Sequence, residues 1–445
     1  MTTLARRLRL IDYFSLAFGT MVGTGWLVVM DDWLIRGGSA GAILGFLIGG
    51  ALLLPIGYVY GKLVSAMPDA AGEVAYTAKV FPQSISFATG WTMLLSYFVV
   101  CPYEAVAAAK IGGYLFPSLS SMELYRVGGK PVYLPHLILS LVVVALVTAM
   151  NYRGIRLSAS FQTWTTLSVI ILGMAFASAG LSHGSAVNFK PLFQGSVFIS
   201  VLLIVQIVPF FMEGFESVGK SAEEAEAGFA GHRFFLAISL AIVVGILFYM
   251  MVIAAVAYAA PRESFMNASF PTAVAFEKAV GSRWIGRLVM ATAFLSLLKC
   301  FNGNMVASSR MFFALGRRGL VDRRLAYVHP ENRTPTLAVL WLGFATALVI
   351  FGGEAILVPV AEVGAVTAAV GWMAACASYI RMKPSTGGLA TAVAGLIVTI
   401  VLVLMKVIPV IPGHFTVYEW IAVAIWSAIG LLLHRAQVPE PMLTS

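Results

Sequence analysis

Four ionisable side chains interrupt long apolar stretches of this sequence. They are Glu104, Glu213, Glu216 and Lys299. An ionisable group near the centre of a hydrocarbon layer costs about 2.5–3.5 kcal/mol on insertion scales, so we expect each of the four to have a structural or functional role. A carboxyl group in such a place can bind a proton on one side of a membrane and release it on the other, which makes all four residues candidates for proton coupling. The alternative is a structural ion pair between Lys299 and either Glu213 or Glu104.

Glycines interrupt two of the same apolar stretches. The stretch FGTMVGTGWLVV (residues 18–29) has glycine at positions 19, 23 and 25, and VQIVPFFMEGFESVGK (residues 205–220) combines Pro209 with Gly214. One interpretation is a small-residue face that lets a neighbouring helix approach closely. Because the interruptions come in a pair, we favour the other interpretation, in which both helices are broken around a polar cavity at membrane depth.

Broken helices would offer bare backbone groups to a ligand. Amide nitrogens at positions 23–25 suit an anion, and the positive end of the following half-helix adds a favourable field. Unpaired carbonyl groups in the second stretch, together with the carboxylates beside them, suit an ammonium group. The two breaks therefore predict a zwitterion such as an α-amino acid or, with less support from the anion side, an amine.

The elements that position these residues are membrane helices. Of 445 residues 60% are hydrophobic and 11% are charged, and the mean hydropathy is +0.90, far from soluble globular composition. The fold class predicted is an all-α membrane protein. Apolar segments predict about twelve transmembrane helices, near residues 12–36, 39–63, 86–110, 135–152, 157–181, 196–220, 234–258, 287–313, 335–352, 356–380, 388–406 and 417–434.

The charge distribution predicts the orientation and the partners. Most of the 29 Lys and Arg residues fall on one set of alternating loops, so both termini are expected to be cytoplasmic in a multi-pass protein of the cytoplasmic (inner) membrane. A lipid bilayer explains the net charge of +9 without a nucleic-acid partner. Three cysteines inside predicted spans and six scattered histidines indicate no disulfide, metal site or cofactor. The oligomeric state stays open.

Two connecting segments predict short helices. They are DAAGEVAYTAKVFP (residues 69–82), on the cytoplasmic side, and SFPTAVAFEKAVGSRWIGRL (residues 269–288), outside. These positions are equivalent if the chain holds two five-helix copies of opposite orientation. The domains expected are residues 1–190, residues 191–385 and a segment with the last two helices and a cytoplasmic tail, residues 386–445.

Four motifs carry a family resemblance over nearly the whole chain. The sequence resembles the amino acid-polyamine-organocation (APC) superfamily of secondary transporters, specifically its amino acid permeases. The similar segments are Gly23-Thr24-Gly25, the stretch from Met67 to Trp91, the F-x-x-G-F-E…A-E-E pattern from Phe211 to Glu224, and the stretch from Ser308 to Pro335.

The resemblance implies a LeuT-type inverted five-helix repeat with helices 1 and 6 broken, and alternating access. It implies that the amides of Thr24 and Gly25 bind a substrate carboxylate, that carbonyl groups in both breaks bind its amine, and that Phe210 or Phe211 shields the site from outside. The residues expected at the substrate site are Met21, Gly23, Thr24, Gly25, Phe210, Phe211, Glu213, Gly214 and Glu104.

The function predicted is a secondary active transporter that imports or exchanges an amino acid or related amine, coupled to protons. Alternatives within the class are a polyamine or amine antiporter and a sodium-coupled symporter, for which Ser308 and Ser309 could supply oxygen ligands. Outside the class, a channel would need rings of carbonyl or charged groups from a repeated unit, which two dissimilar breaks do not supply. No nucleophile–base pair or metal motif suggests an enzyme.

Overall fold

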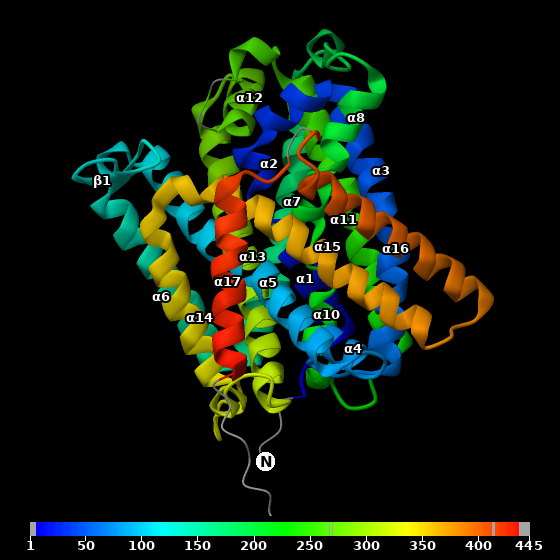
Figure 1. The fold of residues 1–445 in the computed structure, drawn as a ribbon. Coiled ribbons are helices and arrows are strands. Elements are labelled where there is room, and N and C mark those ends of the chain that lie inside the picture. Colours follow the sequence, from blue (N-terminus) through cyan, green and yellow to red (C-terminus); the bar gives the residue numbers. More distant parts are fainter. Residues whose placement is uncertain (1–5, 267, 269, 412–413, 436–445) are drawn as a thin grey trace, which may run out of the picture.

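Apolar helices form most of the protein (Figure 1). The computed structural model describes residues 6–266, 268, 270–411 and 414–435. Within these ranges nine helical stretches are long and apolar enough to cross a membrane: Met30–Ala66, Gln83–Leu115, Leu134–Arg153, Arg156–His183, His232–Ala259, Arg283–Arg317, Thr336–Arg381, Thr386–Val407 and Val417–His434. The predicted class, a membrane protein built of helices, is confirmed.

The first predicted span is interrupted at its glycines. Helix α1 (Leu10–Met21) ends before residues 22–24, and α2 (Gly25–Val28) continues the span beyond them. Helix α3 (Met30–Ala66) follows at once, with a sharp turn at Gly38, whose φ is 68°. Glycine is required there because a Cβ would lie 2.7 Å from the carbonyl oxygen of Leu192. The turn therefore separates the first predicted span from the second.

The sixth predicted span is interrupted as well. It consists of α8 (Val197–Val205), α9 (Val208–Met212) and α10 (Ser217–Lys220), and residues 213–216 separate the last two. Gly214 has a φ of 118°, a conformation that disfavours other residues. Both predicted helix breaks are confirmed.

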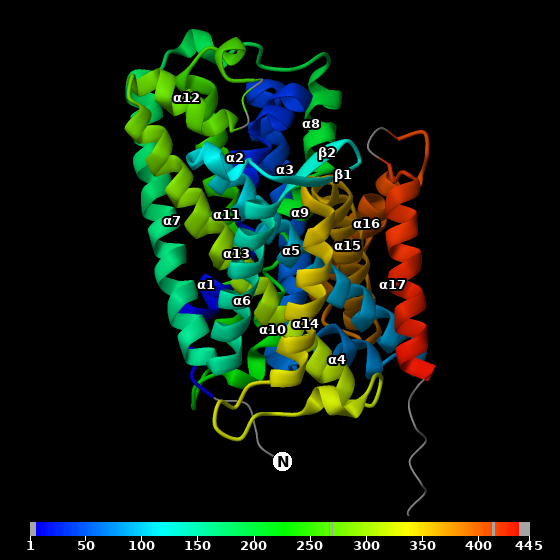
Figure 2. The same cartoon turned by 90° about the vertical axis from the view of Figure 1, so that its left-hand side faces the viewer.

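The other helices pack beside these two interrupted segments (Figures 1 and 2). They are α5 (Gln83–Leu115), α6 (Leu134–Arg153), α7 (Ile155–His183), α11 (His232–Ala259), α13 (Arg283–Arg317), α14 (Thr336–Val349), α15 (Leu357–Arg381), α16 (Thr386–Val407) and α17 (Val417–Arg435), with 3-10 turns η1 (Pro117–Leu119), η2 (Ala186–Phe189), η3 (Ala222–Glu224), η4 (Arg262–Ser264), η5 (Arg323–Ala326) and η6 (Ile350–Ile356). Because η6 joins α14 to α15, the predicted count of twelve spans stays a prediction.

The two short connecting helices lie at opposite ends of the bundle (Figures 1 and 2). They are α4 (Glu73–Ala78) and α12 (Pro271–Val280), and both were predicted. Helix α12 has proline in its first turn, where the missing N–H has no helical partner to lose. It ends at Gly281, whose left-handed conformation is the common way to terminate a helix. We call the two ends of the molecule the α4 face and the α12 face.

A β-hairpin forms the one sheet among the described residues, and it was not predicted. Strand β1 (Glu123–Val127) pairs antiparallel with β2 (Lys130–Tyr133) toward the α12 face (Figure 2). Gly128 and Gly129, with φ of 54° and 77°, supply the two positive φ angles that a tight two-residue hairpin turn requires.

Candidate functional site

The two helix breaks meet at a cavity of about 20 Å³ in the interior. All predicted substrate-site residues except Gly214 line it. The complete lining is Thr20, Met21, Gly23, Thr24, Gly25, Val100, Tyr103, Glu104, Phe210, Phe211, Glu213 and Cys300. Gly214 instead packs against α1, because a Cβ there would lie 2.8 Å from the side chain of Thr20 and 2.9 Å from the backbone nitrogen of Met21.

Glu104 of α5 contacts the backbone of the first break. Its Oε2 accepts a hydrogen bond of 3.0 Å from Thr24 Oγ1, and only 2% of the residue is exposed. A Cβ on Gly23 would overlap Glu104 Oε1, so glycine at this position makes room for the carboxylate. The sequence predicted a substrate carboxylate at the first break, and the structure places a carboxylate of the protein itself against Gly23 and Thr24.

Phe211 covers the next glycine of the break. A Cβ on Gly25 would lie 2.6 Å from Phe211 Cδ1, inside van der Waals contact. The ring of Phe211 packs edge-on against Phe210, with 5.2 Å between ring centroids, and Phe210 packs similarly against Tyr103 at 5.6 Å. Glycine at position 25 therefore allows an aromatic cluster to close over the break.

Glu213 ends α9 at the second break and is 2% exposed. Its Oε2 accepts a hydrogen bond of 3.0 Å from Ser96 Oγ on α5. Its Oε1 has no hydrogen-bond partner among the described residues. Ser96 was not predicted, because a lone serine in a long apolar helix carries no distinctive sequence signal.

Lys299 of α13 is bonded to the end of α1. Its Nζ donates to the carbonyl oxygen of Val22 and, at 3.3 Å, to that of Gly19. The predicted ion pair of Lys299 with Glu213 or Glu104 is wrong, since neither carboxylate is within ion-pair distance of it in the described part of the chain. The last carbonyl groups of a helix lack helical partners and carry partial negative charge, so a buried ammonium group stabilises that end.

Two hydroxyl groups bond further carbonyl groups of the breaks. Ser296 Oγ donates to Gly23 O at 2.8 Å. Tyr249 Oη of α11 donates to Phe211 O at 3.0 Å and to Met21 O at 3.3 Å. The carbonyl group of Met21, expected to bind a substrate amine, is therefore already hydrogen-bonded. Neither hydroxyl was predicted, because serine and tyrosine in helices usually pack or bond their own backbone.

Three other candidates lie outside the cavity and bond local backbone. Glu216 is fully buried and accepts hydrogen bonds of 3.0 and 3.1 Å from the backbone nitrogen of Gly214, which secures the second break. Ser308 Oγ donates to Asn304 O at 2.6 Å and Ser309 Oγ to Val306 O at 3.0 Å within α13. In the ranges that the structure describes, no three His, Cys, Asp or Glu side chains cluster as metal ligands.

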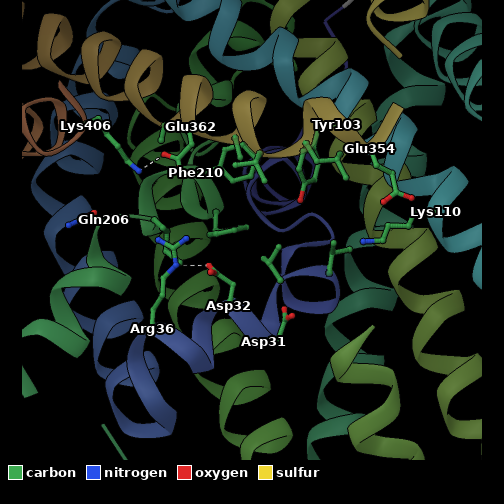
Figure 3. A pocket seen from close by; sticks show the side chains of 18 of the residues that line it. Asp31, Asp32, Arg36, Tyr103, Lys110, Gln206, Phe210, Glu354, Glu362 and Lys406 are labelled. Carbon is green, nitrogen blue, oxygen red and sulfur yellow. Dashed lines mark hydrogen bonds and ion pairs between the residues drawn. The ribbon is translucent and has the colours of Figure 1, made fainter. Parts of the chain in front are cut away.

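A larger cavity of about 330 Å³ (Figure 3) is lined in part by the start of α3 and by Lys130 of β2, which lie toward the α12 face (Figure 2). Tyr103, Phe210 and Phe211 line both cavities and separate the one from the other. Charged side chains line the larger cavity, and two pairs of them are bonded: Arg36 with Asp32 at 2.7 Å, and Lys406 with Glu362. The aromatic cluster therefore forms part of the wall of a cavity that is otherwise rich in charged side chains.

Ion pairs close the molecule toward the α4 face. Two of these pairs are fully buried: Lys220 of α10 with Glu73 of α4, and Arg310 of α13 with Glu224 of η3, the latter at 2.9 Å. Tyr60 Oη also donates to Glu73, at 2.6 Å. More exposed pairs lie beside them and join Arg317 to Glu223 at 2.5 Å and to Asp69 at 3.1 Å, and Arg318 to Asp69 at 2.6 Å.

A family model described as "Amino acid permease" matches residues 12–434. The branched-chain amino acid permease BcaP of Bacillus subtilis (strain 168) is 24% identical over 356 residues, which cover 78% of this chain and 74% of the relative. The lysine-specific permease LysP of Escherichia coli (strain K12) is 23% identical over 405 residues, which cover 85% of this chain and 79% of the relative. The methylthioribose transporter of Bacillus subtilis (strain 168) is 24% identical over 341 residues, which cover 75% of this chain and 72% of the relative.

Proposed function

The chain belongs to the amino acid permease family, and we propose that it imports or exchanges an amino acid or related amine across the cytoplasmic membrane by alternating access. One observation carries the proposal: two interrupted helices meet at a buried cavity that is lined by backbone of both breaks and by the carboxyl groups of Glu104 and Glu213. Irregular backbone at membrane depth is stable only where it lines such a cavity, and transporters place their substrate sites there.

Access to this site differs between the two faces. The 330 Å³ cavity reaches the aromatic cluster from the α12 face, while buried ion pairs close the α4 face. Arg317, Arg318 and Arg323 lie toward the α4 face, so the positive-inside rule makes that face cytoplasmic. In this conformation the substrate would approach from outside.

The central cavity must widen before a substrate binds. A volume of about 20 Å³ suits one water molecule and is too small for an amino acid. Phe210 and Phe211 both belong to α9, just before the second break, so their rings are the mobile barrier in this proposal. Passage then requires the aromatic cluster to open first and the ion pairs of the α4 face afterwards.

An inverted repeat would account for the positions of the breaks. We assign residues 1–190 and 191–385 to two copies of opposite orientation. The α1/α2 break opens the first and the α9/α10 break opens the second, and the short helices α4 and α12 lie on opposite faces. Residues 386–445 would follow as an appended segment.

Glu213 is our first candidate for coupling, because its Oε1 can accept either a proton or an ammonium group of the substrate. Glu104 is the second candidate, whereas Glu216 and Lys299 are bonded to backbone groups of the breaks. Exchange of one amino compound for another is the second mode that we propose, because Glu213 can bind the ammonium group of either compound in turn. Ser308 and Ser309 bond their own helix, which disfavours a sodium site.

Uptake into liposomes containing the purified protein tests the proposal. A panel of labelled amino acids and amines is offered with and without an internal exchange partner. Gly25→Val should lower uptake to below a tenth of wild type, because the new side chain meets the ring of Phe211. Gly387→Val is the matched control, since a Cβ there meets nothing within 4 Å. The proposal fails if no compound is transported, or if both variants transport equally well.

A further inference from the structure

A carboxylate of the protein occupies the anion-binding part of the site. Glu104 Oε2 is hydrogen-bonded to Thr24 Oγ1 at 3.0 Å, and Glu104 Oε1 fills the space beside Gly23 where a Cβ would be. The ring of Phe211 covers Gly25 in the same way. A substrate carboxylate could reach this backbone only by displacing Glu104.

The rest of the cavity is rich in hydrogen-bond acceptors. No described residue donates a hydrogen bond to Glu213 Oε1 or to the carbonyl oxygens of Phe210 and Glu213. None of the described residues that line the cavity is basic. Lys299 is near but is bonded to the carbonyl groups of Gly19 and Val22, and its Nζ lies 5.6 Å from the ring centroid of Phe18.

These two observations point to the chemistry of the substrate. Resting on the transport function proposed above, we propose that Glu104 replaces the carboxylate that an amino acid would bring, so that the site selects a primary amine without a carboxylate beside its amino group. The ammonium group binds Glu213 Oε1 and the free carbonyl groups of the second break. A carboxylate beside it would lie between the carboxylates of Glu104 and Glu213, while the ring of Phe211 covers Gly25 at the first break.

Matched pairs of compounds test the selection in the wild-type protein. Agmatine and arginine, cadaverine and lysine, and isoamylamine and leucine differ within each pair only by the carboxylate. Dissociation constants are measured from the ligand-dependent rise in the thermal midpoint of the purified protein. Within a pair that binds, we expect the dissociation constant of the amine to be at least about tenfold lower than that of the amino acid. A tenfold ratio corresponds to the loss of one hydrogen bond to a charged group.

The possible results separate the two proposals. If the amino acid of each binding pair binds as tightly as its amine or more tightly, the selection is refuted while the transport function stands. If no member of any pair binds, the transport function is contradicted and the selection with it. Neither conclusion depends on a variant that must fold.

Glu104→Gln then tests the residue itself. The amide keeps the shape of the side chain but removes its charge, so the ratio of the two dissociation constants should shift about tenfold toward the amino acid. Glu331→Gln, an exposed loop position with the same change of charge, should leave the ratio unchanged. A ratio in Glu104→Gln equal to that of wild type would overturn the assignment. A general loss of packing would weaken both ligands without reversing their order.

Discussion

The buried pair of Glu73 and Lys220 is expected to stabilise the closed α4 face, and Glu73→Gln tests this. Both side chains have 0% exposure. The glutamine amide oxygen still accepts the hydrogen bond from Tyr60 Oη, so the variant changes little except the charge. Lys220 is then left as a buried ammonium group without its counter-charge.

Removing one partner of a fully buried pair costs about 3–5 kcal/mol, because the remaining charge is desolvated without compensation. Adding Lys220→Met removes that charge as well, so the double variant should recover most of the loss. The more exposed Asp69, which pairs with Arg318 at 2.6 Å, gives the comparison. Asp69→Asn should cost less than about 1 kcal/mol.

The measurement is thermal unfolding in detergent of wild type, both single variants, the double variant and the Asp69→Asn control. We expect Glu73→Gln to have a clearly lower midpoint than the control, and the double variant to lie between Glu73→Gln and wild type. If Glu73→Gln has the same unfolding midpoint as the Asp69→Asn control, the buried pair contributes no more stability than a surface contact. If the two single losses add up in the double variant, the pair is not coupled. Either result refutes the reasoning.

Three further variants test other parts of the structure. Lys299→Met removes the donor to the Val22 carbonyl group and should cost about 1.5–3 kcal/mol of stability, measured as a lower unfolding midpoint; an unchanged midpoint would show that the contact is dispensable. Glu213→Gln cannot exchange a proton, so its uptake should vary less between mildly acidic and neutral pH than that of wild type, and an identical pH profile would exclude Glu213 from coupling. Trp426→Phe removes the indole hydrogen bond of 2.9 Å to Trp91 O and should cost about 1 kcal/mol, so an unfolding midpoint equal to that of wild type would contradict a role for this bond in holding α17.

Local residue types determined the helices and their breaks. Long apolar runs specify membrane helices because the backbone must satisfy its own hydrogen bonds in hydrocarbon. Gly23, Gly25 and Gly214 mark the breaks because glycine weakens a helix and tolerates unusual backbone angles. The hairpin was missed although Gly128-Gly129 is a turn signal, because the strands beside it are short and the surrounding pattern is helical.

The sequence could not determine the partners of the buried charges, because those partners are far apart along the chain. Lys299 bonds Val22 across 277 positions and Glu104 bonds Thr24 across 80. Charge alone suggested that Lys299 pairs with a glutamate. Only the packing of α13 against the end of α1 decided that carbonyl groups are its partners, and only the packing of α5 against the first break decided that Glu104 lies where a substrate carboxylate was expected. Residue types thus established which groups are costly to bury, and tertiary packing decided which atoms compensate them.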